Sequence, residues 1–277
     1  MKIIECPRDA MQGISEFIPT DKKIAYINQL LKVGFDTIDF GSFVSPKVIP
    51  QLKDTAAVLN GLDLSSTSSK LLVIIANTRG ASDACNFQEI DYLGFPLSVS
   101  EEFQKRNTNK SIEQALKTVE EIQNLLINNN KELVVYLSMS FGNPYAENYH
   151  PDIVAKLTEK LDNIEVGIVS LSDTVGISNS ENITPLFSTL IKEFPTIEFG
   201  AHFHTTEDSW KEKIEAAYQN GCRRFDAALK GYGGCPMAKD DLVGNMPTEK
   251  LITYFMEKLG LNLDEFEKSL ILSSATF

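Results

Sequence analysis

Short apolar runs alternate with amphipathic stretches along the whole chain. Eight of these runs are rich in β-branched and aromatic residues, with Gly, Pro, Ser or Asn close by, which is typical of buried β-strands. The predicted strands span residues 2–6, 36–43, 70–77, 89–95, 132–141, 166–173, 197–204 and 222–229. The alternation predicts a strand-and-helix unit that is repeated along the chain.

The stretch 111–127 shows the helical pattern between the strands most clearly. Its apolar side chains recur at steps of three and four residues, which places them on one helix face. They are Ile112, Leu116, Val119, Ile122 and Leu126. Ser111, with Gln114 three residues later, predicts a capping box at the start of this helix. Two further helices are predicted near residues 248–259 and 264–273.

Strands that are separated by connections of helix length run parallel. Eight such units predict an α/β fold, the (β/α)8 TIM barrel, in which the helix near 248–259 is the eighth and the helix near 264–273 is an additional C-terminal helix. An open, doubly wound sheet is the alternative. With 277 residues, 43% of them hydrophobic, the chain can bury one large core, so we expect a single domain over residues 1–277.

Charge and cysteine usage narrow the class of partner. The formal net charge is -12, and an acidic surface repels phosphate backbones and anionic lipids, so we expect neither a nucleic-acid nor a membrane partner. No apolar run reaches the length of a signal-peptide core or a membrane span, and the four cysteines form no C-x-x-C pair. We expect a soluble cytoplasmic protein without disulfides. A homo-oligomer is compatible with this composition.

Polar residues at the predicted strand ends indicate a metal site. Asp9 follows the first strand, and His202 and His204 end the seventh. Side chains two residues apart on a strand share a face, so both imidazoles can converge with a carboxylate at the barrel mouth. Asn245 could add an amide oxygen. This mixed set suits Mg²⁺ or Mn²⁺ better than tetrahedral Zn²⁺, although zinc hydrolases also use a His-x-His pair.

Six segments line up, in order and spacing, with one known family. They are CPRDAMQG at 6–13, IDFGSFVSPK at 38–47, KRNTNKS at 105–111, SDTVG at 172–176, HFH at 202–204, and GYGGCPMA with VGN at 231–238 and 243–245. Each segment alone is weak evidence, but the combination is specific. From about residue 3 to residue 260, the chain resembles the 3-hydroxy-3-methylglutaryl-CoA lyase family, a group of metal-dependent barrel lyases related to Claisen-type synthases.

The resemblance implies cleavage of 3-hydroxy-3-methylglutaryl-CoA to acetyl-CoA and acetoacetate. It implies that Arg8 contacts the thioester oxygen where enolate charge develops, and that Cys235 is a proton-transferring thiol on a glycine-rich loop. His202 and Asp39 are further candidates for catalytic roles. The implied ligands of a divalent metal, Mg²⁺ or Mn²⁺, are Asp9, His202, His204 and Asn245. For Cys235, a small buried hydrophobe is the alternative.

An acyl-CoA is the small-molecule partner that this resemblance implies. Gln12 and Asn107 lie in the matched segments and are assigned to substrate binding. Candidate contacts for the phosphates of coenzyme A are Lys47, Lys105 and Arg106, each of which could instead be a solvated charge. A buried Lys230 would permit a Schiff-base aldolase, but that reaction leaves the His-x-His pair unexplained.

Several positions depart from the family pattern. Gly13, Ile14 and Ser15 replace Asn-Glu-Lys, which removes a cation near the ligand. Asp39 is one methylene shorter than the usual Glu, and Thr205 stands where the family usually has Asp. These changes leave two alternatives: a related lyase that acts on another β-hydroxyacyl-CoA or a 2-oxo acid, and a catalytically degenerate homologue that binds a ligand without turnover.

Overall fold

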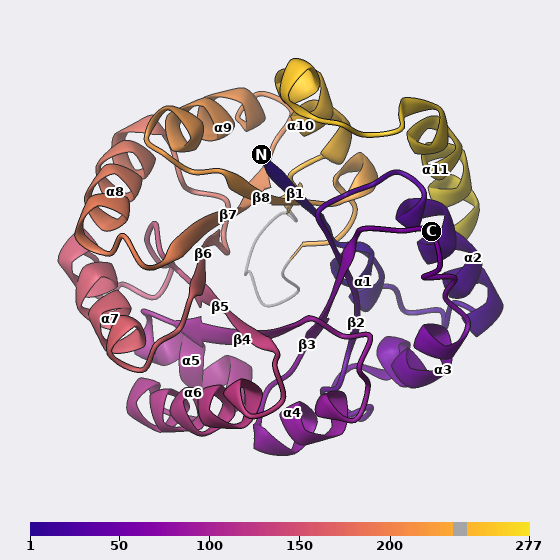
Figure 1. Cartoon of the computed structure of the whole chain (residues 1–277). Coiled ribbons are helices and arrows are strands. Elements are labelled where there is room, and N and C mark those ends of the chain that lie inside the picture. Colours follow the sequence, from indigo (N-terminus) through magenta and orange to yellow (C-terminus); the bar gives the residue numbers. More distant parts are fainter. Residues whose placement is uncertain (235–242) are drawn as a thin grey trace.

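Eight parallel strands form a closed ring, which Figure 1 shows surrounded by helices. The computed structural model describes residues 1–234 and 243–277. The barrel strands are β1 (Lys2–Glu5), β2 (Thr37–Ser42), β3 (Lys70–Ile74), β4 (Tyr92–Ser98), β5 (Glu132–Ser138), β6 (Ile168–Asp173), β7 (Glu198–Thr205) and β8 (Arg224–Ala227). They pair in chain order, and the β1–β8 pair closes the ring. The predicted TIM barrel is confirmed, and the open sheet is excluded.

Helices connect successive barrel strands, and the last two helices follow the final strand. They are α1 (Pro7–Gln12), α2 (Thr20–Leu31), α3 (Thr55–Asn60), α4 (Thr78–Cys85), α5 (Glu101–Thr108), α6 (Ile112–Ile127), α7 (Pro151–Asn163), α8 (Ser180–Glu193), α9 (Trp210–Gln219), α10 (Thr248–Phe255) and α11 (Leu263–Thr276), with 3-10 turns at Pro50–Leu52, Leu229–Gly231 and Met256–Lys258. Each helix in the described parts of the chain is too short or too polar to cross a lipid bilayer.

The helix predicted at 111–127 is α6, and its capping box is present. The Ser111 hydroxyl accepts from the Gln114 N–H (3.1 Å), and the Gln114 side chain accepts from the Ser111 N–H (2.9 Å). These two bonds satisfy donors that the first helical turn would otherwise leave unpaired.

Most predicted strands differ from the observed ones by one to three residues at an end, and two of these differences have clear local reasons. The predicted strand 132–141 ends at Ser138, because Met139 takes a positive φ of 62°, which extended strands do not allow. The predicted strand 89–95 lies three residues too early, because Pro96 is typical of a strand end yet pairs with Tyr136 inside β4.

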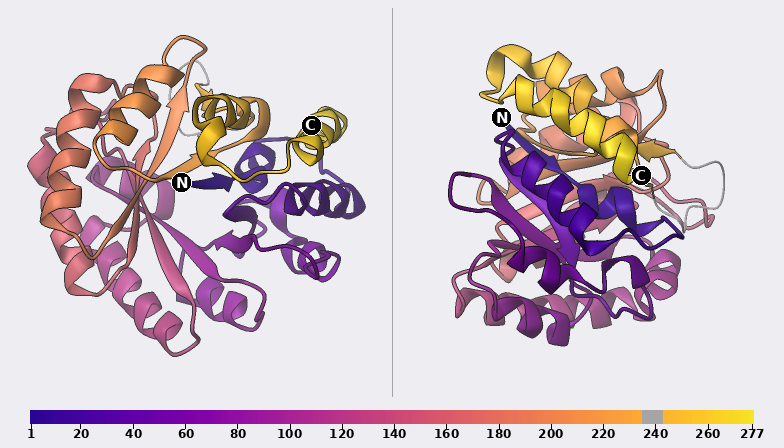
Figure 2. Two further views of the ribbon diagram at one scale, coloured as in Figure 1. Left: turned by 45° about the horizontal axis from the view of Figure 1, so that its top comes forward. Right: turned by 90° about the vertical axis from the view of Figure 1, so that its right-hand side faces the viewer.

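The last helix, α11, is the predicted addition to the barrel, and it packs against α2 (Figure 2). The rings of Tyr26 and Phe277 meet edge to face with centroids 5.2 Å apart. The side-chain amide of Gln29, on α2, donates to the Glu265 carbonyl (2.9 Å). The helix therefore covers apolar surface of α2 that the barrel itself leaves open.

The apolar core has two parts. The larger part fills the space between the strands and the helices. The smaller part lies inside the barrel and consists of Leu72, Tyr92, Val134, Tyr136 and Ile168. Arg224 is also enclosed there, 5.5 Å from the Tyr92 ring centroid, and its guanidinium has no hydrogen-bond partner within residues 1–234 and 243–277. The barrel interior therefore combines apolar packing with buried charge.

Candidate active site

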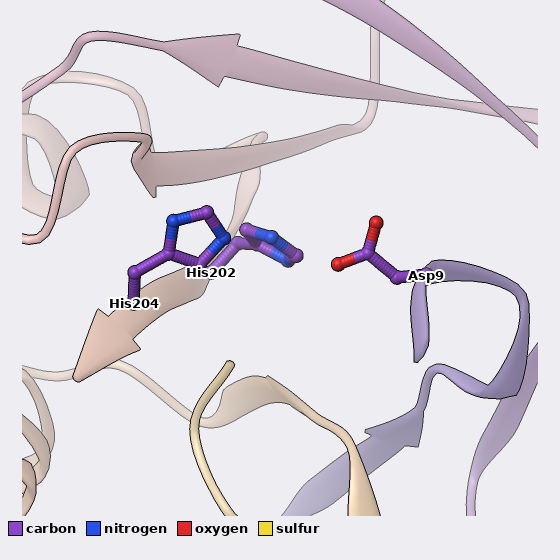
Figure 3. Close-up of side chains that lie close together, drawn as sticks. All are labelled: Asp9, His202 and His204. Carbon is purple, nitrogen blue, oxygen red and sulfur yellow. The ribbon is translucent and has the colours of Figure 1, made fainter. Parts of the chain in front are cut away.

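Three predicted metal ligands meet at the carboxyl ends of the strands. Asp9 lies in α1, directly after β1, while His202 and His204 lie near the end of β7. One ligand atom from each residue lies within 4.8 Å of the other two. Figure 3 shows the carboxylate and both imidazoles turned toward a common point. The predicted convergence of these three side chains is therefore present in the fold.

Both imidazole rings are oriented by hydrogen bonds at Nδ1. His202 Nδ1 lies 3.1 Å from an Asp226 carboxylate oxygen, and His204 Nδ1 lies 3.0 Å from the Thr174 carbonyl. A carbonyl oxygen can only accept, so Nδ1 of His204 carries a hydrogen, and in the neutral ring Nε2 keeps its lone pair. The same holds for His202 when Asp226 is ionised. Such partners are typical of metal-binding histidines.

The two imidazoles differ electrostatically. Burial lowers the pKa of His202, but the hydrogen bond and charge of Asp226 outweigh it, so the pKa is raised. Burial and the neighbouring His202 lower the pKa of His204. For Asp9, burial raises the pKa, while Arg8 and the two imidazoles outweigh it and lower the pKa. Asp9 is therefore a carboxylate at neutral pH, which is the form that binds a cation.

Arg8 links Asp9 to a second buried carboxylate. Its Nη1 donates to Asp9 (2.7 Å) and Gln12 (3.0 Å), while its Nε (3.0 Å) and Nη2 (2.5 Å) both donate to Asp39 Oδ2. Asp39 therefore reaches Arg8 although its side chain is one methylene shorter than the usual Glu. Burial raises the pKa of Asp39 to about 6 although Arg8 opposes the shift. Burial lowers the pKa of Arg8, and the charges of Asp39 and Asp9 outweigh it and raise the pKa, so Arg8 remains cationic.

Asn245 lies beside the cluster, but its amide nitrogen faces Asp9. It belongs to β9 (Gly244–Asn245), which runs antiparallel to the end of β7 and pairs Asn245 with His204. Its Nδ2 donates to Asp9 Oδ2 (2.7 Å) and to the Tyr232 carbonyl (2.9 Å). Asn245 therefore lies next to this group, and it turns its amide nitrogen toward Asp9, whereas the sequence led us to expect its amide oxygen at a metal.

The glycine-rich segment 231–234 lies against Asp9 and Asn245. Gly231, Gly233 and Gly234 all have positive φ. A Cβ on Gly233 would lie 2.7 Å from both the Asn245 amide nitrogen and the Asp9 carbonyl. Position 233 can therefore lie this close to Asp9 and Asn245 only when the residue is glycine. Cys235, which follows it, lies outside the described residues.

A cavity of about 420 Å³ opens above the cluster. Arg8, Asp9, Gln12, His202 and His204 contribute to its lining, together with Arg106, Asn107 and Thr108 of α5. Apolar side chains complete the walls, including Val44, Val48, Ile49, Ile74, Ala76 and Phe103. The volume lies in the range of small-molecule sites.

Three of the five predicted substrate contacts, Gln12, Arg106 and Asn107, line this cavity. Lys47 and Lys105 are exposed, and Lys105 pairs with Glu101 at 3.2 Å. Neither lysine belongs to the described lining of the cavity. The two cationic side chains there are Arg8 and Arg106.

Asp226 and Thr174 also contact the site histidines, although the sequence pattern did not indicate them. Asp226 faces His202 because β7 and β8 pair with these two residues in register. The one feature of the sequence that could have indicated Asp226 is its position as the single carboxylate in the predicted strand 222–229. Thr174 belongs to the SDTVG segment, but its contribution is a backbone carbonyl, for which a side-chain pattern offers no signal.

Comparison with known proteins identifies the family. A family model described as HMGL-like matches residues 2–271. The chain belongs to the HMGL-like family. Among related members, the rat cytoplasmic 3-hydroxy-3-methylglutaryl-CoA lyase is 34% identical over 95% of this chain and 76% of its own length. A hydroxymethylglutaryl-CoA lyase of Bacillus subtilis is 32% identical over 97% of this chain and 88% of its own length.

Solved structures agree with the HMGL-like assignment. An HMG-CoA lyase from Acinetobacter baumannii, in complex with coenzyme A and 3-methylmalate, superimposes with a TM-score of 0.92 and 31% identity over 100% of this chain and 90% of that one. The HMG-CoA lyase from Brucella melitensis gives a TM-score of 0.90 and 29% identity over 99% and 97%. Curated relatives include mitochondrial lyases as well as cytoplasmic ones.

Proposed function

We propose that this protein is a divalent-metal-dependent lyase that cleaves 3-hydroxy-3-methylglutaryl-CoA to acetyl-CoA and acetoacetate. The observation that carries the proposal is the convergence of Asp9, His202 and His204 beside Arg8 in one cavity. Membership of the HMGL-like family and the names of its relatives support the same reaction. The cytoplasmic location, a homo-oligomeric assembly and the single domain 1–277 stay predictions from the sequence.

The donor set fits a divalent cation. Asp9 offers a carboxylate oxygen, and His202 and His204 offer Nε2, because their Nδ1 atoms are engaged by Asp226 and Thr174. We propose Mg²⁺ or Mn²⁺, which accept mixed oxygen and nitrogen ligands. Bound there, the cation would act as a Lewis acid toward the substrate hydroxyl. Asn245 would join as a ligand after a half-turn of its amide, which exchanges Nδ2 for Oδ1.

Arg8 is suited to stabilise the enolate oxygen. Four hydrogen bonds engage its donors, two to Asp39 and one each to Asp9 and Gln12. A guanidinium has five N–H donors, so one remains for the thioester oxygen. Asp39 fixes the plane of the guanidinium, so the charge is held in place before the reaction begins. Asp39 therefore acts through Arg8.

The proton transfers complete the reaction. The substrate hydroxyl loses its proton, the carbon–carbon bond breaks to give acetoacetate, and the resulting enolate carbon of the acetyl thioester takes up a proton. His202, which lines the cavity, takes part in the first transfer by holding the cation that would acidify the hydroxyl, because its Nδ1 faces Asp226 and its Nε2 is assigned to that cation, which leaves neither ring nitrogen free to accept the proton. Cys235 is the proposed acid in the second. Its role rests on the resemblance and on the approach of Gly233 to Asp9.

Substrate binding is assigned to three residues that line the cavity. Gln12 lies next to Arg8, and Arg106 and Asn107 lie on α5. Arg106 is already paired with Glu102 (2.7 Å). Lys47 and Lys105 are proposed to contact coenzyme A phosphates at the surface, where both are exposed. Lys230 is also exposed and contacts Ser274, so nothing supports the Schiff-base aldolase, which needs a buried lysine.

A direct assay tests the proposal. Purified protein with Mg²⁺ or Mn²⁺ should release acetyl-CoA and acetoacetate in equal amounts from 3-hydroxy-3-methylglutaryl-CoA, as followed by chromatography. The Cys235→Ala variant should bind the same metal and lose rate by about 100-fold or more. Release from a different β-hydroxyacyl-CoA alone would redirect the function. Metal binding without release from any thioester would indicate a homologue that only binds ligands.

A further inference from the structure

The backbone of His204 is held by a buried ammonium group that lies outside the cavity. Lys213, on α9, is 1% exposed. Its Nζ donates to the His204 carbonyl (2.8 Å), to Asp173 Oδ2 (2.7 Å) and to the Gly176 carbonyl (3.0 Å). An ammonium group has three N–H donors, so all three are used. The Lys213 ammonium group therefore has all its hydrogens bonded, and one of them holds the backbone of His204.

The ring of His204 is held through the same ammonium group. Asp173 ends β6, and its carboxylate accepts from the Ile177 N–H (2.9 Å) and from both the N–H (3.0 Å) and the hydroxyl (2.5 Å) of Ser178. These bonds fix the turn 174–178, in which Thr174 offers its carbonyl to His204 Nδ1 (3.0 Å). The turn is therefore tied to α9 at Asp173 and Gly176, through Lys213.

We propose that Lys213 is a positioning residue for the candidate metal ligand His204, an inference that rests on the metal site of the proposed function. One ammonium group fixes the His204 backbone directly. Through Asp173 and Gly176, it also fixes the carbonyl that keeps the hydrogen on Nδ1. Both restraints keep Nε2 of His204 directed toward Asp9, so the ligand is oriented before a cation binds.

The energetics of a buried ion pair make a double substitution the informative test of this role. A buried ion pair offsets its own desolvation only partly, and replacing both partners by neutral groups of similar size is often close to neutral for stability. A pair retained only for stability would therefore be replaceable. A pair that positions a metal ligand would instead change the metal affinity when both charges are removed.

The first test is on the unaltered protein. The chain has three histidines, so side-chain 15N NMR can assign each ring. We expect His204 in the metal-free protein to be neutral with its hydrogen on Nδ1. A ring with its hydrogen on Nε2 alone would overturn the proposal, and this result does not depend on any variant folding.

The second test removes the pair without leaving an isolated charge. In the double variant Lys213→Met with Asp173→Asn, the Mn²⁺ affinity, measured from free Mn²⁺ by electron paramagnetic resonance, should fall by about 10- to 100-fold. The fraction of His204 with hydrogen on Nδ1 should also decrease. A folded double variant with unchanged affinity and unchanged 15N shifts would overturn the proposal.

The chain contains a matched control. Lys23 is also 1% exposed, and its Nζ donates to Asp54 (2.7 Å) and to the Gln51 carbonyl. Lys23→Met with Asp54→Asn removes an equivalent pair and should leave the Mn²⁺ affinity unchanged, whatever it does to the thermal midpoint. An equal loss of affinity in both double variants would reduce Lys213 to a structural residue. Unaltered protein that binds no Mn²⁺ would instead contradict the proposed function.

Discussion

At the scale of single residues, the two imidazoles of the site are oriented by different acceptors. His202 is held by a carboxylate, Asp226, and His204 by a backbone carbonyl, that of Thr174. The carboxylate also carries charge, so His202 is the more basic of the two rings, which agrees with the opposite directions of their pKa shifts. Because Thr174 acts through its backbone carbonyl, only the contact to His202 can be tested by replacing a side chain, that of Asp226.

Asp226→Asn should weaken metal binding without removing a ligand. The amide has nearly the same shape as the carboxylate but lacks its charge, and one rotamer would offer an N–H where Nδ1 of His202 needs an acceptor. The Mn²⁺ affinity should fall by about tenfold or more. Asp152→Asn is the control, because Asp152 faces the exposed His150 at 3.3 Å. Equal affinities for the Asp226 variant and unaltered protein would contradict the orienting role.

Residue types at strand ends were predictable, but contacts between strands were not. Asp9, His202 and His204 could be grouped because the period of a strand and the geometry of a barrel place them at one rim. Asp226 meets His202 only through the register of β7 and β8, which side-chain patterns do not specify. Lys213 reads as an ordinary surface lysine of an amphipathic helix, and its burial depends on how α9 packs.

At the scale of elements, a buried carboxyl joins β1 to the segment after β8. Glu5 is completely enclosed, and it accepts from the Leu229 N–H (3.0 Å) and bonds to the Thr248 hydroxyl at the start of α10 (2.5 Å). Burial raises the pKa of Glu5 to about 8, from an ordinary value of 4.5. The folded protein therefore holds a proton that the unfolded chain releases between about pH 4.5 and pH 8.

The sign of the pH effect follows from this raised pKa. Because the folded state binds the extra proton, the stability of the protein relative to Glu5→Gln should fall as the pH rises through this window, by on the order of 5 kcal/mol in full. Chemical denaturation of both proteins at pH 5 and pH 9 measures it. The exposed Glu120→Gln on α6 should show no such pH-dependent difference. A difference for Glu5→Gln that is the same at both pH values would disprove the shift.

The glycine-rich segment makes an element-scale prediction as well. Gly233 has a φ of 91°, and a side chain there would meet Asp9 and Asn245. Gly233→Ala should therefore cost about 1–2 kcal/mol of stability from the left-handed backbone alone and also weaken Mn²⁺ binding. Gly13→Ala is the control, since a Cβ at Gly13 meets nothing within 4 Å and its φ is negative. Unchanged Mn²⁺ binding in Gly233→Ala would contradict the close approach.

At the scale of the whole molecule, the sequence pattern predicted the order of the helices and strands but not the contacts between distant ones. Alternating strands and helices predicted the barrel, and the last amphipathic stretch predicted α11 as an addition. Nothing in that stretch indicated that its end reaches the active-site rim. Phe277 packs on both Tyr26 and Tyr232, with ring centroids 5.2 Å apart in each pair. A contact between residues so far apart in sequence depends on the closed shape.

Phe277→Ala should therefore affect both stability and the site. Loss of two aromatic contacts at a half-buried ring should cost about 1–2 kcal/mol, which lowers the thermal midpoint by about 2–8 °C. Tyr232 precedes Gly233, whose backbone lies against the Asp9 carbonyl, so a looser Tyr232 should also weaken Mn²⁺ binding, by less than about tenfold. Ile271→Ala on the same helix is the control, because Ile271 is 74% exposed and should change neither quantity. A lower midpoint with unaltered Mn²⁺ affinity would show that α11 stabilises the barrel without reaching the site.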